Sequence, residues 1–348
     1  MVTIKEIAKL VNLSPTTVSN VIHGHKGKVS AENYKKISSA LKDTNYISNM
    51  GARLLGHHGS KIIVVILNFD RRAEVNIVSD PFYDQIIGFL EEEIRKQGYF
   101  MMLYTSGSVT ESLRLATAWD IEGLIILGSL PDDAKKFIQQ QQRPLAFIDT
   151  YVDESYMNDD FINVGLQDFQ GGYDITKYLI SLGHRKIAFF ADGDHLIGVD
   201  EKRFLGFKQA LSETGISFQR KDFFALDYRA DKRHAFLREI SRNQLKQYTA
   251  LVFTSDFLAV DAINVFYDNG IKVPRDFSIT GFDHNIFSEQ IRPKLTTIGQ
   301  NVNQKAVLAV DYLVERIQSK HVGRKINILL NTELIVQGST AKPSEVLP

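Results

Sequence analysis

Residues 3–19 of this chain read Thr-Ile-Lys-Glu-Ile-Ala-Lys-Leu-Val-Asn-Leu-Ser-Pro-Thr-Thr-Val-Ser, and this stretch decides how the N-terminal part folds. Thr3 followed three positions later by Glu6 is a capping box, which indicates the first turn of a helix. Apolar residues then recur at helical spacing on one face, so we expect a short helix over Ile4–Leu10. Asn12 and Leu13 supply a tight turn after that helix.

The same stretch opens a second helix, which we expect from Pro15 to about Ile22. Ser14 can cap it, and proline at the first helical position loses no hydrogen bond. Its valines can pack inward, which leaves hydroxyl and amide side chains on the outer face. Two helices joined by so short a turn are typical of a helix-turn-helix, although such an outer face can also be a merely solvated surface. Ser30 caps a third helix, whose apolar residues close a small core.

The charge of the chain is unevenly distributed. Lys and Arg number 41, and Asp and Glu number 41, so the formal net charge is zero. Residues 1–60 nevertheless contain eight basic and three acidic residues and carry +5, and the remainder carries −5. A basic face can be simply solvated, but a basic head on an acidic body is also typical of a nucleic-acid-binding unit joined to a part that does not bind nucleic acid.

The length and composition of the chain exclude several classes of protein. A chain of 348 residues is expected to form two or three domains. It has no cysteine, which removes disulfides, thiolate metal sites and cysteine nucleophiles. No apolar run is long enough for a membrane span, and no apolar signal region opens the chain. We therefore expect a cytoplasmic protein with no membrane partner, no metal and no cofactor.

From Lys61 onward, strands alternate with helices in two similar series. The pattern predicts strands over Ile62–Leu67, Phe100–Tyr104, Gly123–Leu127, Ala146–Ile148, Ile187–Phe190, Ala250–Phe253 and Ser278–Gly281. Such alternation is typical of parallel sheets covered by helices on both faces, here in two lobes. Ligands of such sheets lie beyond the carboxyl ends of the strands, so we expect a small-molecule site in the cleft between the lobes.

Several ordered strings closely resemble the lactose/galactose repressor family of bacterial transcriptional regulators. Besides residues 3–19, the matching strings are Val29-Ser30, Asn45-Tyr46-Ile47, Ala52-Arg53-Leu54-Leu55, Gly183-His184-Arg185-Lys186-Ile187-Ala188, Asp276 to Asp283, and Pro293 to Ile298. The resemblance covers most of the chain and implies an α + α/β architecture, with a helix-turn-helix head, a hinge helix and a body like periplasmic sugar-binding proteins. The domains expected are the head at 1–47, the hinge and linker at 48–60, and the body at 61–341. Within the body, the first lobe is expected at about 61–162 and 295–322, and the second at about 163–294 and 323–341.

The resemblance also implies roles for residues of the head. The positions at which the family contacts bases are Pro15, Thr16 and Asn20 on the recognition helix and Leu55 on the hinge helix, where the family wedges a leucine into the minor groove. The positions at which it contacts phosphates are Thr3, Ser14, Thr17, Ser19, His23, Ser30, Asn33, Tyr46 and Asn49.

Two residues of the head depart from the family pattern. The family usually has arginine where this chain has Asn20, and asparagine pairs best with adenine rather than guanine. We therefore expect an operator that differs from the family's usual one at that base. The family also tends to have proline where Ser48 stands, which makes a looser entry to the hinge helix an expectation.

In the body, the resemblance assigns a set of residues to the effector. These positions are Phe82, Tyr83, Asp149, Arg203, Tyr228, Ser255, Asp256 and Asp283. Carboxylates and a guanidinium suit the paired hydroxyls of a sugar. Without the resemblance, the charged residues can equally be helix caps or ion pairs, and the aromatic ones can be core. Residues 192–201 lack a clear equivalent of the contacts that purine-binding members make, so a sugar is favoured over a nucleobase.

Taken together, the sequence predicts a homodimeric repressor of a carbohydrate-utilisation operon that binds a pseudopalindromic operator and responds to a small-molecule effector. The sign of that response is not readable. A non-sugar ligand or a protein co-repressor stays open as the regulator. A sugar-binding transport protein would explain the body but not the head. An enzyme is not expected, because no metal-spaced histidine cluster, Gly-x-Ser-x-Gly or phosphate-loop motif occurs.

Overall fold

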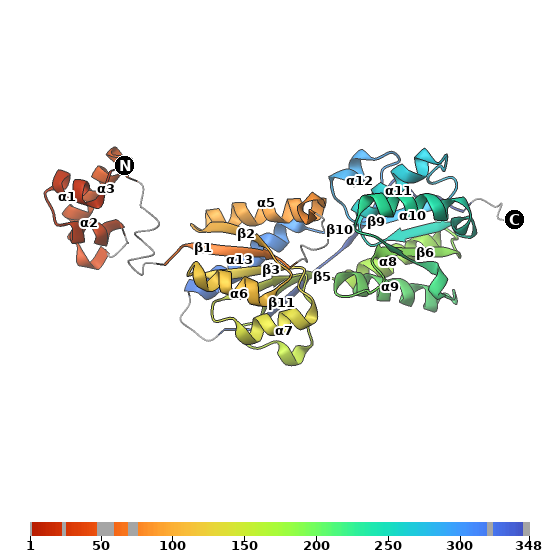
Figure 1. Ribbon diagram of the computed structural model, residues 1–348, viewed down its shortest axis with the longest axis horizontal. Coiled ribbons are helices and arrows are strands. Elements are labelled where there is room, and N and C mark those ends of the chain that lie inside the picture. Colours follow the sequence, from red (N-terminus) through yellow and green to blue (C-terminus); the bar gives the residue numbers. More distant parts are fainter. Residues whose placement is uncertain (1, 23–25, 47–58, 69–75, 319–322, 344–348) are drawn as a thin grey trace. The chain divides into compact units, whose positions relative to one another are not determined.

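The computed structural model describes residues 2–22, 26–46, 59–68, 76–318 and 323–343. The chain divides into two compact units, one of residues 1–61 with 118–122 and one of 62–117 with 123–348 (Figure 1). We call them the head and the body and describe each by itself. Three of the predicted DNA contacts, His23, Asn49 and Leu55, and the predicted hinge helix lie outside the described residues.

The head has the helices that its sequence predicts. They are α1 (Ile4–Val11), α2 (Pro15–Ile22) and α3 (Ala31–Asp43), with a short 3-10 turn at Lys26–Lys28. The capping box forms, because the Glu6 amide donates to Thr3 Oγ1 at 3.3 Å and the Thr3 amide donates to Glu6 Oε2 at 2.7 Å. Asn12 ends α1 in the left-handed conformation, and Ser30 caps α3. Buried Ile7, Val18 and Ile37 join the three helices in one core.

The first lobe of the body is built on a six-stranded sheet in the order β11-β5-β4-β3-β1-β2, with its described strand pairs parallel. Its strands are β1 (Ile62–Leu67), β2 (Phe100–Thr105), β3 (Gly123–Leu127), β4 (Leu145–Ile148), β5 (Ile162–Leu166) and β11 (Ile326–Leu330). Its helices are α5 (Pro81–Lys96), α6 (Val109–Ala118), α7 (Pro131–Gln140) and α13 (Val302–Gln318). The central strands are fully buried, as their runs of Ile, Val and Leu require.

The second lobe repeats this arrangement with the sheet order β12-β10-β9-β8-β6-β7, in which only β12 is antiparallel among the described pairs. Its strands are β6 (Ile187–Asp192), β7 (Phe223–Leu226), β8 (Ala250–Phe253), β9 (Ser278–Asp283), β10 (Thr296–Gly299) and β12 (Glu333–Ile335). Its helices are α8 (Asp168–Ser181), α9 (Val199–Glu213), α10 (Ala230–Arg242), α11 (Asp256–Asp268) and α12 (Ile286–Gln290). None of the described helices is long and apolar enough to span a bilayer.

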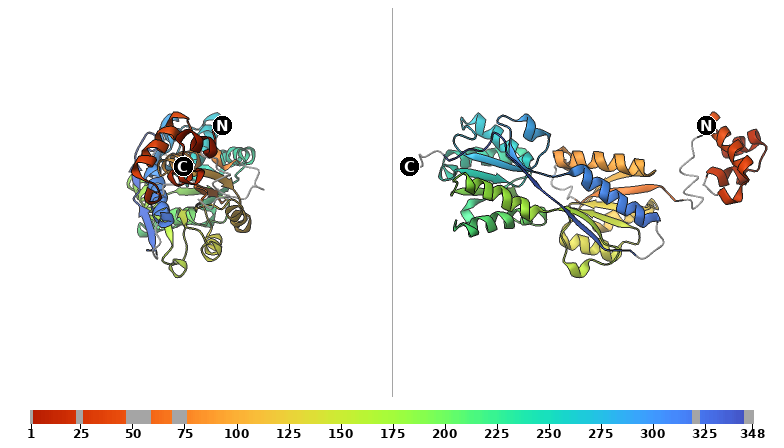
Figure 2. Two further views of the ribbon diagram at one scale, coloured as in Figure 1. Left: turned by 90° about the vertical axis from the view of Figure 1, so that its left-hand side faces the viewer. Right: turned by 180° about the vertical axis from the view of Figure 1, so that it is seen from behind.

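The lobe boundaries expected from the sequence were wrong at three strands. β5 and β11 pair with each other in the first sheet, whereas β10 belongs to the second. The chain therefore passes between the lobes after Leu166, after Gly299 and after Leu330, and not near residues 162, 295 and 323 (Figure 2). A buried strand has the same apolar pattern in either sheet, so the sequence does not specify which partner it pairs with.

Candidate functional site

The outer face of α2 is formed by short polar side chains. Val18 and Val21 are buried, so the helix turns Pro15 and Thr16 fully outward and leaves Asn20 partly exposed. Ser14 precedes the helix and its hydroxyl accepts from the Thr17 amide at 3.1 Å, which caps the N-terminus. Other predicted phosphate contacts of the head, Thr3, Ser19, Ser30 and Asn33, are exposed or partly exposed, whereas Tyr46 packs on the head core.

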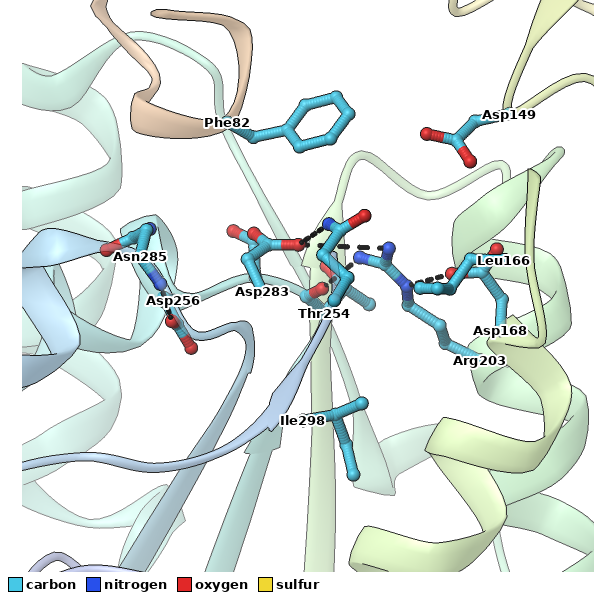
Figure 3. Close-up of polar contacts among 12 residues, drawn as sticks. Phe82, Asp149, Leu166, Asp168, Arg203, Thr254, Asp256, Asp283, Asn285 and Ile298 are labelled. Carbon is cyan, nitrogen blue, oxygen red and sulfur yellow. Dashed lines mark hydrogen bonds and ion pairs between the residues drawn. The ribbon is translucent and has the colours of Figure 1, made fainter. Parts of the chain in front are cut away.

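In the body, a polar cluster forms at the carboxyl ends of strands from both sheets (Figure 3). Asp149 directly follows β4 of the first sheet, and Asp283 ends β9 of the second. Both have positive φ angles, +55° and +120°, so the backbone leaves the strand sharply at each carboxylate. Arg203, in the second turn of α9, lies between Asp283 and Asp168. The structure thus brings together three residues predicted to bind an effector.

Arg203 is held firmly within the second lobe. Its Nε donates to Asp168 Oδ1 at 2.8 Å, its Nη1 donates to the Thr254 carbonyl at 2.6 Å, and its Nη2 lies 3.9 Å from Asp283 Oδ1. The guanidinium also stacks on the Phe282 ring at 3.7 Å. With only 8 % of its surface exposed, Arg203 has its orientation fixed before any ligand arrives.

Asp149 is paired with a lysine that the sequence analysis did not single out. Lys305 Nζ donates to both carboxylate oxygens of Asp149, at 2.8 and 2.7 Å, and to Gln300 Oε1 at 2.7 Å. Gln300 Nε2 in turn donates to Asp283 Oδ1 at 2.7 Å. This series of hydrogen bonds connects Asp149 of the first lobe to Asp283 of the second lobe. It runs through the crossover segment that precedes α13.

A second link runs between the lobes on the other side of Arg203. The Tyr151 hydroxyl, two residues after Asp149, donates to Asp168 Oδ2 at 2.6 Å. Asp168 also binds Arg203, which faces Asp283. Together with Lys305 and Gln300, these groups join strand ends of both sheets in a continuous set of polar contacts.

Burial shifts the acid–base behaviour of this cluster. It raises the pKa of Asp149, although the Lys305 ammonium opposes the shift, and it raises the pKa of Asp283 against the opposing effect of Arg203. Two further aspartates belong to the same environment. Burial raises the pKa of Asp200, in the first turn of α9, to about 6, and that of Asp192, at the end of β6, to about 7. Shifts from burial and specific charged neighbours are common at ligand sites.

Aromatic side chains contribute to the same region. Phe82, in the first turn of α5, points toward the cluster, and Lys305 Nζ lies 5.3 Å from its ring centre (Figure 3). Tyr83 packs edge-on against Phe82 with ring centres 5.3 Å apart. Tyr228 follows β7 and is 46 % exposed. Burial, and after it the charge of Asp192, raise the pKa of Tyr228 to about 12.

The predicted pair Ser255 and Asp256 is placed differently. The Ser255 hydroxyl accepts from the Leu258 amide at 3.3 Å and so caps α11. Asp256 is fully buried, and its two oxygens accept from the Thr297 hydroxyl at 2.5 Å and from the Asn285 amide at 2.9 Å. These bonds hold the turn after β9 in place.

Sequence reasoning missed Lys305, Gln300, Asp168 and Tyr151. A signal existed for Lys305, because it lies on the apolar face of α13 among Val302, Ala306 and Ala309, where a charged residue is unusual. No sequence signal pointed to Gln300, Asp168 or Tyr151, since the lobe to which each residue contributes depends on where the chain crosses between the lobes. Among the described residues, no group of three or more His, Cys, Asp or Glu side chains could hold a metal ion.

Comparison with known proteins agrees with this division into head and body. Residues 3–49 match the model of bacterial regulatory proteins of the lacI family, and residues 176–340 match a periplasmic binding protein-like domain. The HTH-type transcriptional repressor PurR of Aliivibrio salmonicida is 30% identical over 351 residues, covering 98% of this chain and 100% of that protein. The chain belongs to the lacI family of bacterial regulatory proteins. It is therefore a DNA-binding transcriptional regulator.

Other relatives of this lacI-family regulator have similar coverage. PurR of Pasteurella multocida is 29% identical over 97% of this chain and 98% of its own length. The regulator MalR of Clostridium butyricum is 27% identical over 97% and 98%. Among solved structures, a lac repressor dimer bound to operator and the anti-inducer ONPF has a TM-score of 0.80 at 24% identity, covering 98% of this chain and 99% of that one. That likeness supports the fold.

Proposed function

We propose that this protein is a repressor of carbohydrate-utilisation genes whose affinity for its operator is controlled by a sugar bound at the polar cluster between the lobes. The observation that carries the proposal is the convergence of Asp149, Arg203 and Asp283 beside Phe82. A fixed fork of donors next to carboxylate acceptors and an aromatic face has the chemistry that recognises a polyol.

On the DNA side, α2 enters the major groove. Pro15, Thr16 and Asn20 contact base edges, and the hydroxyl and amide groups around the N-termini of α1, α2 and α3 contact phosphates. Their outward placement supports this assignment. One helix of this length buries too little surface to be specific alone, so the active form is a homodimer on a pseudopalindromic operator in the cytoplasm.

Titles of structural neighbours support a sugar effector. One is a regulator named CelR in complex with cellobiose, with a TM-score of 0.69 at 23% identity, over 97% of this chain and 100% of that one. Another is a lacI-family regulator from Enterococcus faecium with bound ribose, with a TM-score of 0.66 at 24% identity, over 81% and 100%. In this chain, a sugar at the lobe junction replaces some of the hydrogen bonds and ion pairs that join the two lobes. Its binding changes the free energy of operator binding by roughly 1–3 kcal/mol. We further propose that the sugar is bound and released unchanged.

A gel shift on an operator obtained by binding-site selection tests the proposal. Titration of simple sugars changes the wild-type shift, and Arg203→Ala abolishes the change while operator binding without sugar stays within about threefold. Arg238→Ala, which removes an exposed arginine from α10 of the same lobe, is the matched control and retains the response. Loss of operator binding by Arg203→Ala with the sugar response intact contradicts the assignment.

A further inference from the structure

The charges of the two buried cations at the lobe junction are already paired with aspartates. Arg203 donates from Nε to Asp168 and from Nη1 to the Thr254 carbonyl, and its Nη2 lies 3.9 Å from Asp283, so the N–H groups that remain can still meet a neutral hydroxyl. The three contacts of Lys305 match the three donors of an ammonium group, and its side chain is only 1 % exposed. An incoming phosphate or carboxylate would compete with an aspartate for the charge of either cation.

The carboxylates of the cluster outnumber these cations. Asp149 is neutralised by Lys305 and Asp168 by Arg203, which leaves Asp283 with only the longer 3.9 Å approach to Arg203. Asp283 Oδ1 accepts from Gln300, and within the described residues Oδ2 has no hydrogen-bond donor. Asp200 lies one helical turn before Arg203, and Asp192 ends a strand of the same sheet. At pH 7.5, above the pKa of about 6 of Asp200 and of about 7 of Asp192, both of these carboxyl groups are mainly ionised, so the charge left over at the junction is negative.

We infer that the effector is an uncharged polyol, that is a free sugar, and that the site rejects sugar phosphates and sugar acids. An ionised carboxylate only accepts hydrogen bonds, so the carboxylates of this cluster favour a ligand rich in donors, and hydroxyls supply them without added negative charge. An anionic group would meet like charge in a poorly solvated site, where repulsion is strong. This inference rests on the proposed function and specifies the chemical class of its ligand.

A partly exposed cation near the cluster, Lys202, offers the obvious alternative. Lys202 Nζ lies 5.5 Å from the centre of the Tyr151 ring, and its side chain is partly exposed. If the site took a phosphate, Lys202 would be the group able to reach it without breaking a buried ion pair. Substitution of Lys202 therefore distinguishes a site for a free sugar from a site for a sugar phosphate.

Isothermal titration calorimetry on the full-length protein at pH 7.5 tests the inference. The probes are glucose, galactose, xylose, ribose, cellobiose and maltose, together with glucose 6-phosphate, ribose 5-phosphate and glucuronate. At least one free sugar binds, and each anionic probe binds on the order of 100-fold more weakly than that sugar, or not at all. Lys202→Gln leaves the affinity for the free sugar within about threefold.

A charge variant sharpens the result. Asp200→Asn removes one negative charge beside Arg203, so the affinity ratio between the free sugar and its phosphate falls by roughly threefold to tenfold. Asp268→Asn makes the same change on the exposed end of α11 and leaves the ratio unchanged. A phosphate or glucuronate that binds as tightly as any free sugar, or loss of binding in Lys202→Gln, overturns the inference but leaves a sugar-derived effector in place. Failure of every probe overturns the sugar effector of the proposed function as well.

Discussion

Asn20 is the residue of α2 on which the operator sequence depends most. It is partly exposed, between buried Val18 and Val21 of the same helix. An asparagine side chain forms paired hydrogen bonds with adenine, whereas arginine forms them with guanine. We predict that the wild type selects adenine at the base facing Asn20, and that Asn20→Arg shifts the preference to guanine by about 1–3 kcal/mol. Binding-site selection on randomised duplexes measures the change.

The control for this substitution is Asn33→Arg on α3, which adds the same charge at a position expected to contact phosphate. A phosphate contact strengthens binding to all sequences alike and does not change base preference. If wild type already selects guanine at this base, or if both variants change the selected sequence equally, Asn20 does not read the base.

Asp192 makes the stability of the body depend on pH. Burial and the neighbouring Asp200 raise its pKa to about 7, whereas an aspartate in the unfolded chain has a pKa of about 4. Below about pH 4 both states hold the proton and the residue has no effect. Between about pH 4 and 7 only the folded state holds it, so stability falls as pH rises, and above about pH 7 the full cost is present.

Asp192→Asn removes this dependence, because the amide does not titrate. We predict that the variant gains stability relative to wild type as pH rises from 5 to 8, measured as the difference in urea midpoint at each pH. Asp268→Asn, which removes an exposed carboxylate, is the control for the loss of one charge. A constant difference between Asp192→Asn and wild type would mean that burial does not raise the pKa of Asp192 in the folded body.

At the scale of elements, the approach of α8 to α9 determines where Arg203 lies. Both helices have glycines at their contact. A Cβ on Gly206 would lie 2.0 Å from the Phe169 carbonyl oxygen, and a Cβ on Gly172 would lie 2.1 Å from the Arg203 carbonyl oxygen. Only glycine permits so close a contact, and this contact allows Arg203 to reach Asp168 from the neighbouring helix.

We predict that Gly206→Ala pushes α9 away from α8, destabilises the body by about 3 kcal/mol or more, and weakens the response to effector. Gly88→Ala is the matched control, because Gly88 lies on the exposed face of helix α5 with nothing within 4 Å of the added Cβ. Gly88→Ala leaves the stability of the body unchanged or raises it by about 0.5–1 kcal/mol. Urea unfolding of both variants measures the difference, and equal stabilities would show that the two helices can separate at little cost.

The same elements show what the sequence could predict. β1, β3 and β8 have the bounds expected from their apolar runs, and α1 begins at its capping box. The glycine contact between α8 and α9 could not be foreseen, because a glycine within a helical pattern does not identify what approaches it. Asp149, Arg203 and Asp283 were assigned from the resemblance to the family, whereas the pairing of Lys305 with Asp149 depends on a distant crossover that local pattern does not specify.

At the scale of the whole molecule, the two units differ greatly in the core that stabilises each. Among the described residues of the head, the core consists of seven buried apolar residues, namely Ile7, Ala8, Val11, Val18, Val21, Ile37 and Ala40. The body has two much larger clusters, one of them shared by helices and strands of both lobes. A domain of about 60 residues buries a smaller fraction of its surface than a larger one and is correspondingly less stable.

We therefore predict two transitions in differential scanning calorimetry of the full-length protein, the head unfolding first and the body at higher temperature. A free sugar at about 100 times its Kd stabilises the unit that binds it by about 2.7 kcal/mol, which raises the melting temperature of the body by roughly 5 °C. The head transition stays unchanged in the absence of operator, because its residues are not part of the effector site. A single transition that shifts as a whole on addition of sugar would mean instead that head and body unfold as one cooperative unit, and the response to effector would then act through the stability of the entire chain.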